Sequence, residues 1–233
     1  MSIDINKVYK TVLVILEQEK RGVLTPTEFG RVATQAQQEV FTSYFDELNQ
    51  LLRMPQTSLA YADRMALLDE KISLFKRSES LTIVAQEITP SSAVQELGSV
   101  IYTENIPGRE MQRIQQQDVY TVNESPLTKP TAFYPVYTYE NKIIKVYPSN
   151  LSGTIQLNYL SFPEDVKWGF TIDPELGNYI YNPLDSTNFE LHESDQPLLI
   201  DKILGYAGVM SKDQLALSLG SQKEQQINAD SQK

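Results

Sequence analysis

Side chains that could perform catalysis or bind a metal are few in this sequence. There is no cysteine and a single histidine, His192, so thiol nucleophiles, zinc–cysteine centres and histidine clusters within one chain are excluded. His192 lies in Phe189-Glu-Leu-His-Glu193, and no nucleophile elbow accompanies it anywhere in the chain. We therefore expect His192 at the surface or at the start of a helix rather than as a catalytic base.

The acidic pairs give no stronger signal. They occur at Asp46-Glu47, Asp69-Glu70 and Glu164-Asp165, and neighbouring residues on a helix point apart, so the first two predict solvated helix surface. Glycine-rich phosphate loops are absent from the sequence. We predict that the protein is not an enzyme and has no catalytic residues, no metal site and no cofactor.

The charge balance limits the classes of partner that the protein can bind. Lys and Arg number 20 against 30 Asp and Glu, a net charge of −10, whereas nucleic-acid binders cluster Lys and Arg on one surface. The sequence has no run of about 18 apolar residues, so it predicts no membrane span. The first residues do not resemble a signal peptide. We expect no membrane partner and synthesis in a cytoplasm.

Helical periodicity dominates the N-terminal part. Apolar residues recur every three to four positions over Ile5–Glu19 and again, more weakly, over Ser58–Lys76. Between them, Thr25-Pro-Thr-Glu28 predicts a capping box with proline in the first turn. The long helix that follows is expected to bury a stripe made of Phe29, Val32, Ala33, Ala36, Val40, Tyr44, Leu48, Leu51 and Leu52.

The middle of the chain has the patterns of strands. Phe133–Tyr139 and Lys142–Tyr147 flank a turn at Glu140-Asn141, and Thr154–Phe162 follows, so we predict a three-stranded antiparallel meander. Helical spacing returns at Ser194–Leu219. The fold class is therefore α+β: an N-terminal helical bundle to which a C-terminal helix returns, with an antiparallel meander between. The predicted parts are a helical subdomain 1–80, a β-rich subdomain 81–170, an acidic irregular loop 171–195, the C-terminal helix 196–219 and a flexible tail 220–233.

Acidic residues gather in the predicted loop. From Asp173 to Asp195 there are six acids and no Lys or Arg. Two interpretations stay open: a solvated rim, or an acidic surface that faces a basic partner or repels a polyanion. The candidate rim or channel residues are Asp173, Glu175, Asp185 and Glu190.

Tyrosine is frequent, with 13 residues. Cross-strand pairs in a sheet, a protein interface and a sugar-binding face all use tyrosine. The residues concerned are Tyr134, Tyr137, Tyr139, Tyr147, Tyr159, Tyr179 and Tyr181.

The last 14 residues, 220–233, offer only Ile227 and Ala229 as apolar side chains. Such a segment cannot offset its own ordering entropy. It is either an untethered terminus or a tail that a partner orders, in which case Gln222, Gln225, Gln226 and Ile227 are the candidate docking residues.

The order of these elements over residues 5–220 resembles the head-to-tail connector (adaptor or ring) proteins of tailed bacteriophages, and most closely the ring proteins below the portal of crAss-like phages. The segments that carry the resemblance are packing patterns. They are Thr25–Phe41, Tyr44–Asn49, Tyr134-Pro135, Ile144–Pro148, Ile155–Pro163 and Leu199–Val209.

The resemblance implies a non-enzymatic virion protein, assembled in the host bacterial cytoplasm. It implies a ring, expected to have twelve copies, that contacts the portal and other ring or tail proteins and passes genome DNA without binding it tightly. The helix at Leu59–Phe75 is extra to the smallest adaptors and is a candidate contact with a neighbouring ring. The alternative is a minor tail or carbohydrate-binding module with a Tyr-rich β face, which predicts sugar affinity from an isolated monomer.

Overall fold

Helix α2 (Pro26–Arg53) begins at the predicted cap. The Thr25 backbone N–H donates to Glu28 Oε2 at 3.0 Å, and the Glu28 N–H donates to Thr25 Oγ1 at 3.4 Å. The capping box is confirmed, and it satisfies one N–H that the helix leaves without an internal partner, together with the N–H of the cap residue itself.

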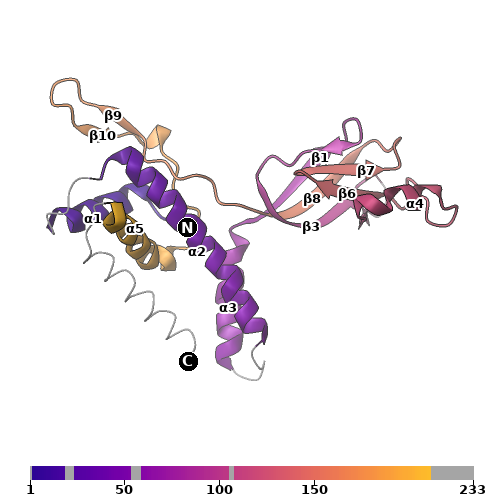
Figure 1. Ribbon diagram of the computed structural model, residues 1–233, viewed down its shortest axis with the longest axis horizontal. Coiled ribbons are helices and arrows are strands. Elements are labelled where there is room, and N and C mark those ends of the chain that lie inside the picture. Colours follow the sequence, from indigo (N-terminus) through magenta and orange to yellow (C-terminus); the bar gives the residue numbers. More distant parts are fainter. Residues whose placement is uncertain (1, 19–23, 54–58, 105–107, 211–233) are drawn as a thin grey trace. The chain divides into compact units, whose positions relative to one another are not determined.

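The predicted stripe on α2 is buried as far as Tyr44 and again at Leu51, but Leu48 is half-buried and Leu52 is exposed. Beyond Tyr44, α2 runs beside α3 (Leu59–Ser73) (Figure 1). Among the described residues, α3 is the helix that packs beside this end of α2, and one helix covers only part of the circumference of another, so the buried stripe narrows there.

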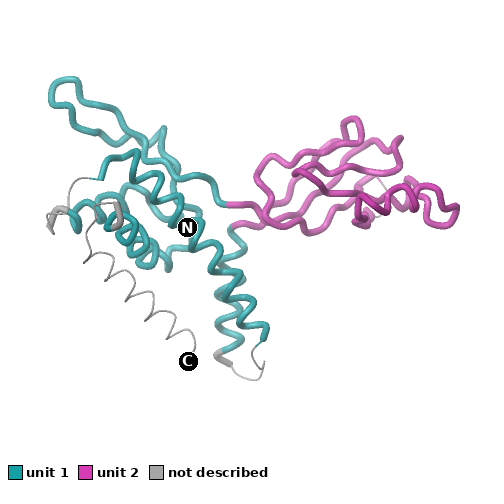
Figure 2. The backbone as a smooth tube through the Cα atoms, viewed as in Figure 1, with its two compact units in different colours: residues 1–74, 163–233 teal, residues 75–162 magenta. Residues whose placement is uncertain are grey.

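The computed structural model describes residues 2–18, 24–53, 59–104 and 108–210, and Figure 2 shows its two compact units. Unit 1 comprises residues 1–74 and 163–233, and unit 2 comprises residues 75–162. The predicted subdomain borders, 80/81 and 170/171, lie several residues after the borders between these two units. The reason is local: α3 ends at Ser73, strand β1 begins at Lys76, and residues 164–166 bond to α2.

Unit 1 is the helical unit. Helix α5 (Gln196–Met210) packs against α1 (Ile5–Gln18) and α2 (Figure 1), so the return of the C-terminal helix is confirmed. The predicted extension of this helix to residue 219 lies outside the described residues. The core combines side chains from the three helices, including Ile5, Val12, Phe29, Phe41, Leu199 and Ile203.

The stretch predicted as an irregular loop, 171–195, is a hairpin followed by short turns. Strands β9 (Phe170–Ile172) and β10 (Tyr179–Tyr181) pair antiparallel. The 3-10 helices η2 (Pro183–Asp185) and η3 (Glu193–Asp195) follow. The irregular-loop prediction was wrong because three-residue strands are too short to display an alternating pattern.

Unit 2 consists of two four-stranded sheets that share one core. The first has the order β1 (Lys76–Thr82), β8 (Thr154–Ser161), β3 (Val94–Tyr102), β4 (Arg109–Glu110). The second has the order β2 (Glu87–Ile88), β7 (Ile143–Tyr147), β6 (Val136–Glu140), β5 (Gln112–Arg113). The 3-10 helix η1 (Gln116–Asp118) and helix α4 (Val119–Glu124) connect β5 to β6 and bury no residue.

The predicted meander holds for two of its three strands. Strands β6 and β7 form the predicted hairpin, but its two-residue loop is Asn141-Lys142, both at positive φ, one residue later than the predicted Glu140-Asn141. The first strand begins at Val136, just after Pro135, rather than at Phe133. The third strand, β8, instead pairs with β1 and β3 in the other sheet. Its Ile155 and Leu157 bury against the same core as Ile144 of β7. An alternating strand looks the same whichever strand it pairs with, so the sequence could not reveal the change of sheet.

Candidate assembly interface

The hairpin β9–β10 exposes apolar side chains along its length. Leu176, in the turn, is 74 % exposed, and Ile172, Tyr179 and Ile180 are also exposed, as is Leu184 just after the hairpin. Figure 1 shows the hairpin projecting from the helices of unit 1. An isolated two-stranded hairpin is marginally stable in water, so its base must be held in place.

An aromatic cluster holds that base. Trp168 is 5 % exposed. Its ring centroid lies 4.5 Å from that of Tyr9 on α1, 6.1 Å from Phe170 and 5.5 Å from Tyr181. Burial raises the pKa of Tyr9 to about 12, and its hydroxyl donates to the Leu24 carbonyl at 3.1 Å. The base of the hairpin is therefore packed against buried aromatic rings and held in place, whereas its turn is exposed to solvent.

Polar side chains of α2 hold the segment that leads into and out of the hairpin. The Gln37 side chain is completely buried; its Nε2 donates to the Glu164 carbonyl at 2.7 Å, and its Oε1 accepts from the Glu190 N–H at 3.0 Å. The Val166 N–H donates to Thr34 Oγ1 at 3.1 Å. One face of α2 thus fixes the chain on both sides of the hairpin.

The four candidate acids do not form one site. Only Asp173 and Glu175 share the hairpin turn, where Asp173 Oδ1 accepts from the Glu175 N–H at 2.9 Å. Asp185 pairs with Lys167 at 2.7 Å, and Glu190 Oε2 accepts from the Glu164 N–H at 3.1 Å. The acidic stretch lacks basic residues in sequence, yet other parts of unit 1 supply counter-charges to it.

A hollow of about 450 Å³ lies beside the hairpin base. The first turns of α2 form one wall of the hollow. At Gly30 this wall is so close to the opposite one that a Cβ added there would lie 3.5 Å from the Val166 carbonyl oxygen. Val166, Trp168 and Phe170 supply its apolar lining. Its charged side chains are Arg31, Asp165 and Lys167.

A second polar cluster joins α2, α3 and η3. Asp195 is buried; its Oδ2 accepts from the Tyr44 hydroxyl at 2.5 Å, and its Oδ1 pairs with Lys71 Nζ at 2.7 Å. Burial, followed by the Asp195 carboxylate, raises the pKa of Tyr44 far above its usual value. The cluster fixes α3 to the start of α5.

His192 is the N-terminal capping residue of η3, in agreement with its expected place at a helix start. Its Nδ1 accepts from the Ser194 N–H at 3.2 Å and lies 2.8 Å from Ser194 Oγ, and its Nε2 is 3.8 Å from Glu70 Oε1. Because the Ser194 N–H already occupies the Nδ1 lone pair, this Ser–His contact is a local cap rather than an activated nucleophile.

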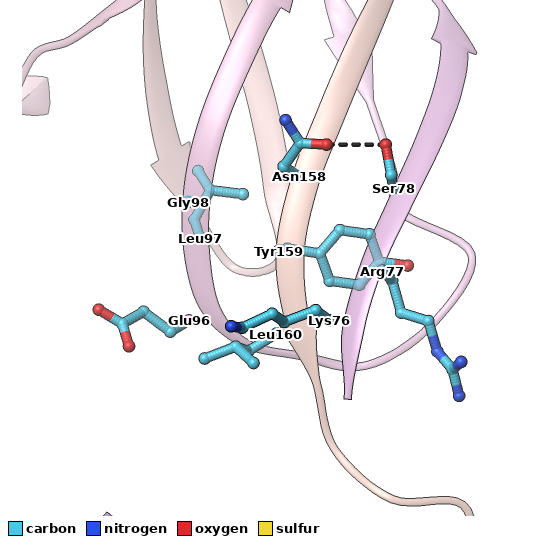
Figure 3. Close-up of a pocket in the computed structure, with 9 residues that line it drawn as sticks. All are labelled: Lys76, Arg77, Ser78, Glu96, Leu97, Gly98, Asn158, Tyr159 and Leu160. Atoms are coloured by element: carbon cyan, nitrogen blue, oxygen red, sulfur yellow. Dashed lines mark hydrogen bonds between the residues drawn. The ribbon is translucent and has the colours of Figure 1, made fainter. Parts of the chain in front are cut away.

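Unit 2 has a hollow of about 410 Å³ on the face of β1, β8 and β3 (Figure 3). Ser78 Oγ donates to Asn158 Oδ1 at 2.7 Å, and Asn158 Nδ2 donates to Ser99 Oγ at 2.9 Å. Gly98 lies where a Cβ would come within 2.9 Å of the Asn158 carbonyl. These polar groups satisfy one another across three strands, and the arrangement stabilises the bulged β3 rather than presenting reactive groups.

The tyrosines do not share one face. Tyr137 and Tyr159 are buried in the core of unit 2, and Tyr139 and Tyr147 form cross-strand pairs with Ile144 and Val136. Tyr134 is exposed beneath Arg109, whose guanidinium carbon lies 4.6 Å from the ring centroid. Tyr179 and Tyr181 belong to unit 1. They too form cross-strand pairs, with Ile172 and Phe170, so the cross-strand interpretation fits six of the seven tyrosines, all except Tyr134.

The hairpin was missed by sequence reasoning, although Phe170-Thr-Ile and Tyr179-Ile-Tyr flank a turn-forming Asp-Pro-Glu-Leu-Gly-Asn. The candidate tail residues Gln222, Gln225, Gln226 and Ile227 lie outside the described residues. Within the described ranges, no group of three His, Cys, Asp or Glu side chains is placed to hold a metal ion. No described helix is both long and apolar enough to cross a membrane.

No known protein family model matches this chain, and no curated protein matches it either.

Proposed function

We propose that this protein is a structural subunit of the head-to-tail connector of a tailed bacteriophage. Copies assemble into a ring beneath the portal, extend the DNA channel and link the portal to the tail. The ring is expected to have twelve copies and to contact the portal and other ring or tail proteins within the virion. The subunit performs no catalysis.

The observation that carries this proposal is the anchored hairpin of residues 170–181. Its base is held by the Trp168 cluster, while Leu176, Tyr179 and Ile180 face solvent. Exposed apolar groups on a fixed projection are typical of protein–protein contacts. In the proposed ring, neighbouring copies cover these exposed side chains. The projection therefore suits a ring subunit better than a protein that acts as a monomer.

The charge supports a conduit for DNA. The net charge is −10, and Asp173 and Glu175 lie at the turn of the projection. Each phosphate contact adds affinity that must be broken as DNA moves, so an acidic subunit favours passage over binding.

The carbohydrate-binding alternative receives less support. It requires tyrosines gathered on one β face, whereas Tyr137 and Tyr159 are core residues and Tyr179 lies in the other unit.

Native mass spectrometry and electron microscopy of the purified protein, alone and with the portal protein of the same virus, test the proposal. We expect a discrete ring that stacks on the portal. A monomer that ignores the portal and binds glycans would instead identify the carbohydrate-binding module.

A further inference from the structure

We propose that the hairpin turn of one copy inserts Leu176 into the hollow between α2 and Trp168 of the next copy. This inference rests on the proposed self-assembly and names the surfaces that meet. The occupant of the hollow is thus a second copy of this chain.

The turn cannot fill the hollow of its own copy. Phe170, the first residue of β9, lines the hollow, and the chain runs outward from there through six further residues to Leu176. The Asp173 N–H donates to the Asn178 carbonyl and the Gly177 N–H donates to the Asp173 carbonyl, both at 2.9 Å. Folding the turn back onto Phe170 would break the β9–β10 pairing.

The apolar surfaces are complementary. Leu176 is an exposed apolar side chain in the turn, at the end of a fixed projection. The hollow has a volume of about 450 Å³ and is lined by Val166, Trp168 and Phe170. That volume lies within the range of pockets that bury a ligand of several heavy atoms, and an inserted leucine would remove apolar surface of both copies from water.

The charged side chains of the turn and of the hollow indicate how the two copies are oriented when they meet. Glu175, next to Leu176, and Arg31, at the edge of the hollow, are both exposed. Within its own copy Arg31 acts on Glu28, one turn earlier on α2, and helps to hold the pKa of that carboxyl below its usual value, but Glu28 is also bonded to Thr25. Lys167 is already paired with Asp185, and Asp173 caps its own turn. Asp165, the remaining charge, disfavours the approach of acids to its side of the hollow. The Glu175 carboxylate is thus directed to Arg31.

Such a contact is heterologous, because the turn and the hollow are different surfaces of unit 1. Repeated from copy to copy, it closes into a ring when the rotation per copy divides the circle and otherwise continues as a filament. A two-fold contact of hairpin against hairpin would stop at a dimer.

The absence of cysteine from the sequence makes crosslinking a sharp test. The full-length double variant Leu176→Cys with Thr27→Cys places thiols on the turn and on an exposed residue that lines the hollow. With a short bis-maleimide we expect a ladder that extends beyond the dimer. Each single-cysteine variant should give no ladder. The matched control is Leu184→Cys with Thr27→Cys, which uses a leucine just after the hairpin that is even more exposed than Leu176 and should give no ladder.

Charge exchange gives a second measurement. Glu175→Arg alone should weaken self-association by about tenfold, and adding Arg31→Glu should restore it. A ladder of equal strength from the Leu184→Cys control, or dimers from Leu176→Cys alone, would overturn the inference. Rings seen by electron microscopy that never crosslink through residues 27 and 176 would also overturn it and leave the proposed function standing. A chain that neither crosslinks nor binds the portal would contradict both.

Discussion

Gln37 allows a quantitative test of how α2 holds the hairpin segment. Its side chain is fully buried and bonds to the backbone at Glu164 and Glu190. The substitution Gln37→Leu keeps a similar volume and removes both bonds. The Glu164 carbonyl and the Glu190 N–H then lose these partners.

The cost follows from those two groups. A buried polar group without a partner costs about 1–3 kcal/mol, so two give about 2–6 kcal/mol. Water can reach the backbone side of these partly buried bonds, so we expect the lower half of this range, about 2–4 kcal/mol. For a domain of this size, each kcal/mol lowers Tm by about 2–4 °C.

The assay uses Trp168, the only tryptophan, which is buried in unit 1 and therefore reports unfolding of that unit in urea. Gln35→Leu is the matched control, because it makes the same change at an exposed position of the same helix. Gln37→Glu adds a pH test. Its carboxylate repels the Glu164 carbonyl, so its deficit should shrink as pH falls and the carboxyl becomes able to donate. If Gln37→Leu lowers the urea midpoint no more than Gln35→Leu does, the bridging role of Gln37 is refuted.

Three further predictions concern other contacts of unit 1. Tyr44→Phe removes the hydroxyl that donates to the buried Asp195 and should cost about 1.5–3 kcal/mol, measured by urea unfolding. The Thr25 hydroxyl and N–H hold the pKa of Glu28 below its usual value. The contribution of the Glu28 carboxylate to stability is therefore present above the unfolded pKa and lost as pH falls through the folded pKa. In thermal melts, Glu28→Gln should thus lower Tm less in acid than at neutral pH. Gly205→Ala, in α5 with open space at the added Cβ among the described residues, should raise the free energy of unfolding by up to about 1 kcal/mol, and unchanged or lower stability would show that another backbone approaches this glycine.

Local signals in the sequence were sufficient for the elements that depend on neighbouring residues. The capping box at Thr25 and the two-residue turn between β6 and β7 involve residues three or fewer positions apart. The structure has the capping box as predicted and the turn one residue later than predicted. The partner of β8 was not predictable in this way, because its pairing with β1 joins residues as distant as Lys76 and Leu160. Non-local pairing is decided by the whole core.

The candidate site was less predictable than the fold. Asp185 and Asp195 look like members of an unpaired acidic run, yet Lys167 and Lys71 neutralise them from other elements. The buried Gln37 looks like any polar residue of a helix, although its bonds to residues 164 and 190 make it a structural anchor. Charge and polarity in the sequence indicate which residues can bond, and only the fold determines which partners they find.

The insertion of unit 2 explains why unit 1 can be built from two distant segments. An unstructured connection of residues 75–162 would cost about 4 kcal/mol of closure entropy, from (3/2)RT ln n. Unit 2 removes much of this cost by folding, because β1 and β8 pair antiparallel and the Ser161 N–H donates to the Phe75 carbonyl at 2.9 Å. The two connections therefore leave unit 2 side by side. The polar contacts of α2 with residues 164, 166, 190 and 195 then have only to fix the register of the returning chain, and this register places the hairpin next to the hollow on α2.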